Sequence, residues 1–289
     1  MRLGTATALG IGILGAAAVA GCRSGVNYSG PLGPRYAGGV ALAPPAEDAA
    51  RAGSTRAAPD TIRLVTFNIQ YARRIDSAIA LLESAVPLTH ADIVTLQEMD
   101  AAGTRRIAEA LGMSWVYYPA TVSPATGRDF GNAILSRWPM ADDKKIILPH
   151  RARFDKTERI ATAATVLVGD VPVRVYSVHL GTIADVGPGA RRDQARVVMA
   201  DAAAYPRVIV SGDMNSHGIG KAFRAAGYAW PTERNPRTDH LWNWDHIFLR
   251  GLALRDSAST GVVRHNRHAS DHRPVWAVVS LRDRSSEPR

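Results

Sequence analysis

The sequence predicts an α+β fold in which two β-sheets pack into a sandwich with helices on the outside. Short β-rich runs alternate along the chain with a few segments of helical periodicity. Several predicted strands also follow one another closely enough to pair as hairpins. The clearest hairpin joins ATAATVLV (161–168) to VPVRVYSVHL (171–180) through Gly169-Asp170. Hairpins between sequential strands favour a sandwich over the alternative, a doubly wound parallel sheet.

The first 22 residues resemble an export signal rather than part of the core. Arg2 precedes a short apolar run, and small residues lead to Cys22. The stretch VAGC (19–22) resembles a bacterial lipobox, which implies cleavage before Cys22 and a lipid on its thiol. The alternative is ordinary cleavage nearby, which leaves a free thiol. We therefore expect an exported protein that is anchored by lipid to a bacterial membrane. Arg23 rather than Asp follows Cys22, which favours the outer membrane and periplasm.

The remaining chain divides into a linker, one domain and a tail. Residues 23–60 are rich in Gly, Pro and Ala and show no periodicity, which predicts a flexible tether. Residues 61–281 form the predicted domain, and residues 282–289 a disordered tail. The single cysteine excludes an internal disulfide, but a domain of this size can bury a sufficient core without one. We expect a monomer.

The charge balance favours anionic partners. The chain carries a formal net charge of +9. Arg2, the linker and the tail each account for one net positive charge, so the domain carries about +6. Such an excess attracts nucleic acid, phosphorylated small molecules or lipid head groups.

Local patterns place the elements of the domain in order. Helical spacing is seen at 75–85, at 103–111 with Gly112 placed to end the helix, at 188–204 and at 218–226. Besides the hairpin, strands are predicted for IRLVTFN (62–68), DIVTLQE (92–98), WVYYPA (115–120), GNAILSRWP (131–139), RVIVSGD (207–213), WDHIFLRG (244–251), LALRDSA (252–258) and HRPVWAVVSL (272–281).

Polar residues recur where these apolar strands begin or end, which is where a scaffold commonly holds functional groups. They are Asn68, Glu98, His179, Asp213, Asn215, Asp245, Asp271 and His272. The oxygen-bearing side chains of Asn68, Glu98 and Asp271 suit a hard cation such as Mg²⁺. No HExxH motif or cysteine cluster is present for zinc.

The other strand-end residues suit acid–base chemistry on a phosphate. Asp213 could accept a proton from water, and Asn215 could donate hydrogen bonds to a phosphoryl oxygen. His179 and His272 could act as acids, bases or charge stabilisers. Asp245 could hold His272 in one tautomer.

Seven motifs in order resemble the endonuclease/exonuclease/phosphatase superfamily: TFNIQ, TLQEMD, GNAILSRWP, YSVHLG, SGDMNS, WDHIF and SDHRP. The resemblance covers residues 62–281. It implies a four-layer α/β/β/α sandwich and a Mg²⁺- or Mn²⁺-dependent attack of water on a phosphate ester.

The resemblance also implies a role for each motif residue. Asn68, Glu98 and Asp271 would belong to the metal site. His179 would contact the scissile phosphate, Asp213 would activate water, Asn215 would bind phosphate and Asp245 would buttress His272. Asn132 and Arg159 are candidates for substrate contact. For Arg191 and Gln194, the sequence does not decide between a functional and a structural role.

The substrate stays open at this point. The positive charge favours a nuclease that cleaves DNA or RNA, whereas the expected membrane anchor favours a phosphodiesterase or phosphatase acting on phospholipids or head groups. A third hypothesis is a catalytically silent binding lipoprotein. The complete set of acid, base and metal-type residues argues against the third.

Overall fold

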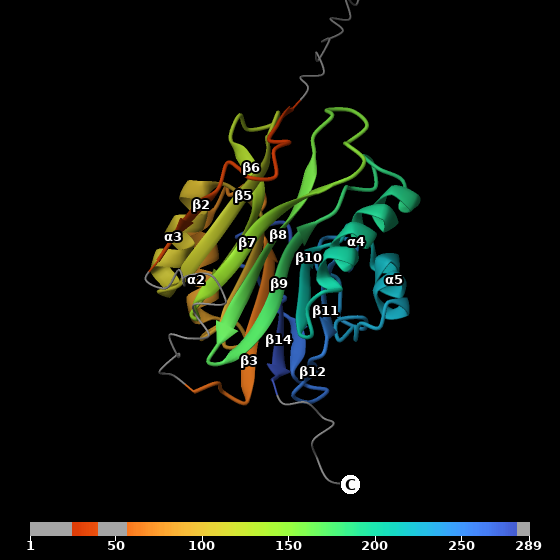
Figure 1. Ribbon diagram of the computed structural model, residues 1–289. Helices are drawn as coiled ribbons and strands as arrows, with labels where there is room; N and C mark the ends of the chain where they lie inside the picture. Colours follow the sequence, from red (N-terminus) through yellow and green to blue (C-terminus); the bar gives the residue numbers. More distant parts are fainter. Residues whose placement is uncertain (1–24, 40–56, 282–289) are drawn as a thin grey trace, which may run out of the picture.

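The computed structural model describes residues 25–39 and 57–281, and Figure 1 shows their arrangement. The predicted signal segment, Cys22 and the C-terminal tail lie outside the described residues. Among the residues described, no helix is long and apolar enough to cross a membrane.

Two mixed β-sheets form the centre of the molecule, which confirms the predicted fold class. The first sheet has the order β1-β5-β6-β4-β3-β14-β12, with β2 paired to β5 and β13 to β14. Its strands are β1 (Val26–Asn27), β2 (Tyr36–Gly38), β3 (Thr61–Asn68), β4 (Ile93–Met99), β5 (Ser114–Val122), β6 (Asp129–Ser136), β12 (Ala253–Leu254), β13 (Thr260–Val262) and β14 (Val275–Ser280).

The second sheet has the order β11-β10-β9-β8-β7. Its strands are β7 (Met140–Leu148), β8 (Arg159–Val168), β9 (Val171–His179), β10 (Val208–Asp213) and β11 (Asp245–Arg250). The β8–β9 hairpin turns at Gly169, as predicted, with a positive φ of 63° that glycine adopts without strain. β7 was not predicted, because Asp142, Asp143 and two lysines interrupt its apolar pattern. Charged residues of this kind are common on the edge strand that β7 forms.

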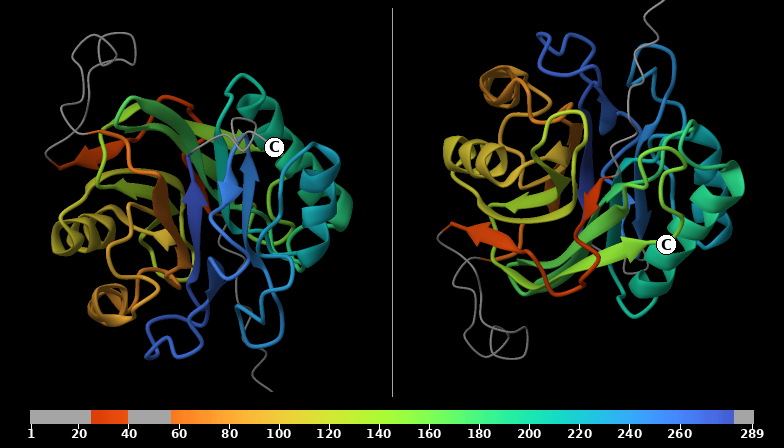
Figure 2. Two further views of the ribbon diagram at one scale, coloured as in Figure 1. Left: turned by 90° about the horizontal axis from the view of Figure 1, so that it is seen from below. Right: turned by 90° about the horizontal axis from the view of Figure 1, so that it is seen from above.

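Helices cover the outer face of each sheet, giving four layers (Figure 2). The helices α2 (Ile75–Ser84) and α3 (Ala101–Leu111) pack on the first sheet, and α4 (Pro188–Ala202) and α5 (Gly220–Ala225) on the second. The Asp100 side chain caps α3 by accepting a hydrogen bond from the Gly103 amide, and Gly112 ends it with φ 61°. The four helices lie within a few residues of the predicted ranges.

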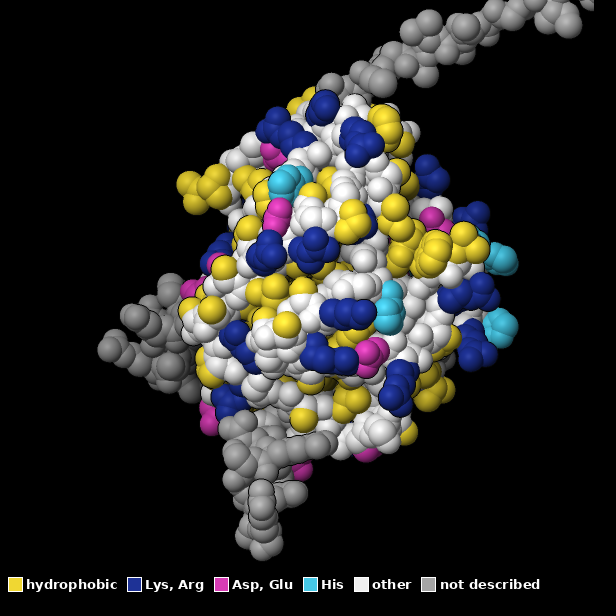
Figure 3. All heavy atoms as spheres, turned by 90° about the vertical axis from the view of Figure 1, so that its right-hand side faces the viewer, with side chains coloured by type: hydrophobic (Ala, Val, Ile, Leu, Met, Phe, Trp, Pro, Cys, Tyr) yellow, Lys and Arg dark blue, Asp and Glu magenta, His cyan; other side chains and the backbone are white. Residues whose placement is uncertain are grey.

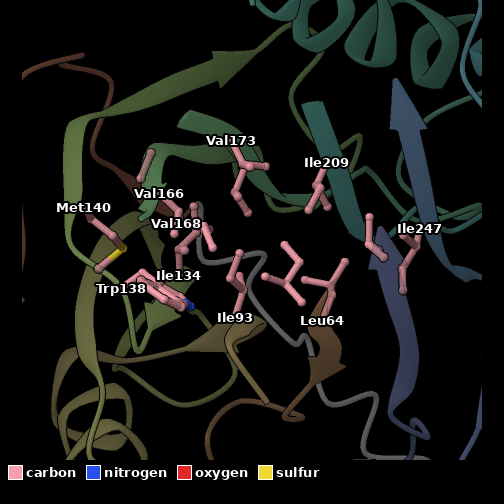
Figure 4. Close-up of a cluster of buried hydrophobic side chains, with 14 of the residues drawn as sticks. Leu64, Ile93, Ile134, Trp138, Met140, Val166, Val168, Val173, Ile209 and Ile247 are labelled. Atoms are coloured by element: carbon pink, nitrogen blue, oxygen red, sulfur yellow. The ribbon is translucent and has the colours of Figure 1, made fainter. Parts of the chain in front are cut away.

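The main core lies between the two sheets (Figure 4). Leu64 and Ile93 of the first sheet face Val173, Ile209 and Ile247 of the second, and all five are fully buried. Alternate residues of these strands point inward, so the apolar runs recognised in the sequence supply both inner faces.

Residues 25–39 are part of the domain, which corrects their assignment to a flexible tether. β1 pairs with β5 through Val26 and Val122, and β2 pairs with the same strand through Tyr36 and Tyr117. Lys145 Nζ also donates a hydrogen bond to the Gly33 carbonyl at 2.6 Å. Strands of two and three residues are too short to produce a periodic pattern and were therefore not predicted.

Candidate active site

Three of the predicted site residues lie in one row across the second sheet. Asp213 is paired with His179 across the parallel strands β10 and β9, and with Asp245 across the antiparallel strands β10 and β11. Gly212 precedes this row with φ 144°, and a Cβ atom there would lie 1.9 Å from the Val178 carbonyl oxygen. Glycine is therefore required for β10 to approach β9 this closely.

His272 reaches this row from the first sheet, in the segment before β14. Its Nδ1 atom lies 2.8 Å from Asp245 Oδ2, and its Nε2 atom lies 3.7 Å from Asp213 Oδ2. Burial disfavours the charged imidazole, but the carboxylates of Asp245 and Asp213 outweigh burial and raise the pKa of His272 well above its ordinary value. His272 is therefore a positively charged group at neutral pH.

Asp213 has the protonation behaviour of a general base. Burial raises its pKa to about 7; the Asp245 carboxylate also raises it, and His272 opposes the shift. Oδ1 accepts a hydrogen bond from the Asn215 amide at 2.8 Å, and Oδ2 accepts one from Asn68 Nδ2 at 3.1 Å. A carboxylate with a pKa near neutrality can take a proton from water and later release it.

His179 is the neutral imidazole of the site. Burial lowers its pKa well below the ordinary value, and the charges of Arg159 and His272 act in the same direction. Arg159 Nη1 lies 3.1 Å from Nδ1 of this ring. An uncharged His179 can accept a hydrogen bond from Arg159 or donate one to a phosphate oxygen, depending on its tautomer.

Two of the predicted metal ligands, Asn68 and Glu98, lie beside Asp213. Asn68 Nδ2 donates to Glu98 Oε1 at 3.1 Å. Glu98 lies at a bulge in β4 and has the left-handed φ of 58°, which is uncommon for a residue other than glycine. Loss of hydration raises the pKa of Glu98, and the nearby Asp271 carboxylate raises it further.

The carboxylates of Glu98 and Asp271, together with the side-chain oxygen of Asn68, are a donor set that fits a hard divalent cation. The donor atoms of Asp213, Asp245 and His272 also lie within 4.8 Å of one another and could hold a metal. However, Nδ1 of His272 is already engaged by Asp245. The assignment of the metal to Asn68, Glu98 and Asp271 stays a prediction beside this second group.

Arg159 lies on the wall of the site, as expected for a residue that contacts substrate. Its guanidinium lies over the Phe130 ring, 5.2 Å from the centroid, and its Nη2 atom is 3.6 Å from Asp185 Oδ2. A shallow pocket beside it is lined by Tyr71 and Phe130 together with Thr157. The sequence did not identify Tyr71, Phe130 or Asp185, because they lie outside the recognised strand ends or have no distinctive spacing.

Three other candidates serve the scaffold. Asn132 is buried, and its Nδ2 atom donates to the Ile160 and Ser177 carbonyls, which favours a structural role over the expected substrate contact. Arg191 donates to the Thr182 and Val186 carbonyls. Gln194 accepts from the Gly181 amide and donates to the Pro149 carbonyl. Arg191 and Gln194 thus hold two loops near the site in place.

Asn215 is positioned next to Asp213 but is only partly available. Its Nδ2 atom donates to the Leu180 carbonyl at 2.9 Å. Its φ of 47° lies in the left-handed region, which Asn tolerates better than most residues. Its expected contact with phosphate stays a prediction.

A sandwich of two sheets with carboxylate, imidazole and carboxamide side chains clustered at one end is typical of a class of hydrolytic phosphoesterases. The chain belongs to the endonuclease/exonuclease/phosphatase family, whose model matches residues 65–272. No curated protein sequence matches the chain.

Solved structures share the fold at low sequence identity. An endonuclease/exonuclease/phosphatase from Beutenbergia cavernae is 20% identical over 77% of this chain and 72% of that chain, with a TM-score of 0.62. The human Nocturnin catalytic domain with bound sulfate anion is 20% identical over 76% and 94%, with a TM-score of 0.60. D. rerio TDP2 complexed with single-strand DNA product is 17% identical over 77% and 100%, with a TM-score of 0.59.

Proposed function

We propose that this protein is a phosphodiesterase that requires Mg²⁺ or Mn²⁺ and cleaves its substrate by in-line attack of water. The observation that carries the proposal is one buried cluster in which the His272 imidazole lies 2.8 Å from Asp245 and 3.7 Å from Asp213. Asp213 has a pKa of about 7, while the pKa of neighbouring His272 is raised well above its ordinary value. Titratable neighbours whose environments separate their roles in this way are typical of acid–base sites.

Each side chain has a role consistent with its charge. Asp213 orients the attacking water and takes its proton. The positive charges of His272 and Arg159 stabilise negative charge that develops on the phosphoryl oxygens. Neutral His179 donates a hydrogen bond to the same group. A divalent cation held by Asn68, Glu98 and Asp271 would supply Lewis-acid stabilisation of that charge.

The substrate class is a choice between nucleic acid and phospholipid. The positive net charge supports a nuclease, and the TDP2 neighbour is a complex with single-strand DNA product. In Figure 3, however, Lys and Arg side chains are spread over the face of α4 and α5 and do not form one continuous stripe. A second candidate, a phospholipid or head-group phosphodiesterase, is favoured by apolar side chains such as Phe154 and Ile183 that are exposed around the site.

We propose further that the protein is exported and held at a bacterial membrane, preferably the outer membrane, by a lipid on Cys22. The lipobox-like sequence VAGC that ends at this residue supports the proposal. Mass spectrometry of Cys22 in protein from the producing cell would detect the lipid directly. A signal-cleaved chain with a free thiol would contradict this part of the proposal.

Hydrolysis of a small soluble diester, bis(p-nitrophenyl) phosphate, tests the chemistry without assuming the natural substrate. The chain beginning at Arg23 contains every described residue. We expect activity with Mg²⁺ or Mn²⁺, none with a chelator, and loss by orders of magnitude in His272→Asn. The matched control is His90→Asn, because His90 is exposed and precedes β4 at the opposite end from the site. Equal activity in both variants would refute the assigned role of His272.

A further inference from the structure

Exposed apolar side chains gather at the end of the molecule that carries the candidate active site. Among the described residues, eight large apolar side chains are exposed. Five of them belong to segments around the site, namely Val26, Phe154, Ile183, Leu241 and Trp242. An exposed apolar group is costly when isolated in water, so several at one end of a molecule indicate a surface that is covered in function.

Two loops next to the site carry two of these side chains, Phe154 and Ile183. Loop 149–158 precedes Arg159 and loop 181–187 follows His179. The Arg153 amide donates to the Asp185 carbonyl at 3.1 Å, so the loops are joined to one another. Phe154 is 61% exposed and Ile183 is 55% exposed. We call these two loops the rim; Figure 2 (right) looks onto this end of the molecule.

Three cationic side chains are exposed on the rim, and its three acids, which are less exposed, bring its formal net charge to zero. Arg151, Arg153 and Lys156 are exposed in loop 149–158. Of the three acids, Glu158 is buried and paired with Arg151 at 2.6 Å, Asp155 accepts hydrogen bonds from Thr157, and Asp185 lies 3.6 Å from Arg159. Apolar side chains at a loop tip, surrounded by Arg and Lys, match the interface of a bilayer that contains anionic lipids.

The N-terminal segment begins at the same rim. The Gly25 amide donates to the Asp155 carbonyl at 2.7 Å, and Asn27 Nδ2 donates to the Lys156 carbonyl at 2.8 Å. Cys22 lies three residues before Gly25 in the sequence, a span of at most about 11 Å even when fully extended. A lipid on Cys22 would therefore hold the rim against the bilayer rather than let the domain move freely on a long tether.

We propose that the rim docks on an anionic bilayer with the active site facing the lipid, and that the substrate is the phosphodiester of a phospholipid head group. This inference rests on the phosphodiesterase function proposed above. In the reaction, the water oxygen forms a bond to phosphorus and one ester P–O bond breaks. The hydroxyl of water ends on the phosphate and its proton on the departing alcohol oxygen.

Vesicle sedimentation tests the docking without the lipid anchor, because the chain beginning at Arg23 lacks Cys22. The probes are vesicles of phosphatidylcholine with and without phosphatidylglycerol. We expect binding that requires phosphatidylglycerol, and about tenfold weaker binding in the double variant Phe154→Ser/Ile183→Ser, since each side chain loses contact with the apolar interior. Val86→Ser is the matched control, because Val86 is also exposed and its carbonyl accepts a hydrogen bond from Arg63 near the start of β3, away from the site.

Three results would overturn the inference. They are no binding to anionic vesicles, equal binding by the double variant and the control, or a double variant that loses affinity for single-stranded DNA while the protein ignores vesicles. Hydrolysis of the soluble diester separates this inference from the function on which it rests. Active protein that does not bind vesicles rejects the docking alone, whereas folded protein that binds vesicles but cleaves no diester rejects the phosphodiesterase function.

Discussion

Nδ1 of His272 lies 2.8 Å from Oδ2 of Asp245, and the second oxygen of Asp245 is buried without a hydrogen-bond partner. The carboxylate is therefore directed almost wholly at one imidazole. Such a pair fixes the tautomer and orientation of the ring and stabilises its charged form. Asp245 is a positioning residue, because it acts on the phosphate through His272.

Replacing this carboxylate should change both the rate and the pH dependence. In Asp245→Asn we expect the kcat/KM for the soluble diester to fall about a hundredfold or more. Asp245 raises the pKa of Asp213 and that of His272. Activity should therefore begin at a lower pH, where Asp213 loses its proton, and disappear at a lower pH, where His272 loses its charge.

The measurement is kcat/KM across the pH range for the wild type and Asp245→Asn. A lower rate with an unchanged profile would show that Asp245 does not set either protonation state. Asp239→Asn is a suitable comparison, since Asp239 lies in the loop before β11 and its carboxylate accepts hydrogen bonds from the backbone amides of Leu241 and Trp242.

Another buried histidine, His246, should make the stability of the fold, rather than the reaction, sensitive to acid. Burial lowers the pKa of His246 to about 3. The folded protein thus keeps this ring neutral while the unfolded chain takes up a proton below about pH 6.5. Its contribution to stability is complete above that pH and is lost as the pH falls, by up to about 1.4 kcal/mol per pH unit.

Urea unfolding at several pH values between neutrality and pH 4 would measure this effect. In His246→Asn the free energy of unfolding should depend less steeply on pH, although the variant is less stable at neutrality because the Trp230 indole N–H loses its acceptor. An unchanged slope would mean that His246 is not the group responsible.

The guanidinium of Arg159 should matter for more than its charge. Its planar group lies over Phe130 and donates to His179, a geometry that an ammonium group does not reproduce. We expect Arg159→Lys to lower kcat/KM by about tenfold, in line with the loss of one bidentate or stacked contact. Arg151→Lys, at an exposed position of the loop that precedes β8, should retain nearly full activity.

Steady-state kinetics of both variants, with melting curves to establish that they fold, decide the point. If Arg159→Lys and Arg151→Lys behave alike, Arg159 contributes only positive charge to the region.

Glu98 should control the requirement for metal. Glu98→Gln keeps the shape of the side chain but removes one negative charge from the donor set formed with Asn68 and Asp271. We expect the concentration of Mg²⁺ needed for half-maximal activity to rise about tenfold or more, because fewer anionic oxygens hold the cation. Titration calorimetry with Mg²⁺ gives the same comparison without catalysis. Glu109→Gln, on the exposed surface of α3, should change neither value.

Residues at strand ends were predictable from the sequence, because apolar runs end where the sheet ends. Asn68 and Asp213 are 145 residues apart and still come within hydrogen-bond distance. Their meeting follows from strand order, which the family motifs imply but the local pattern does not show. The outer helices were predictable for the same local reasons, namely periodicity and caps.

The rest depended on tertiary contacts that have no local signature. Phe130 and Tyr71 acquire their places beside Arg159 only when β6 and the loop after β3 are brought together. Asn132 lies in a recognised motif, yet its amide is directed at the carbonyls of neighbouring strands. The short strands β1 and β2 depend on pairing with β5, and no property of residues 25–39 alone indicates it.

The contacts of Asn68 with Asp213 and of His272 with Asp245 each join one sheet to the other. Neither sheet by itself contains a base, a charged imidazole and a set of metal ligands. Catalysis is therefore possible only after the two halves of the sandwich have docked in register. A turnover assay on this chain is then a direct measure of completed folding, and a partly assembled molecule would be unable to attack phosphate esters.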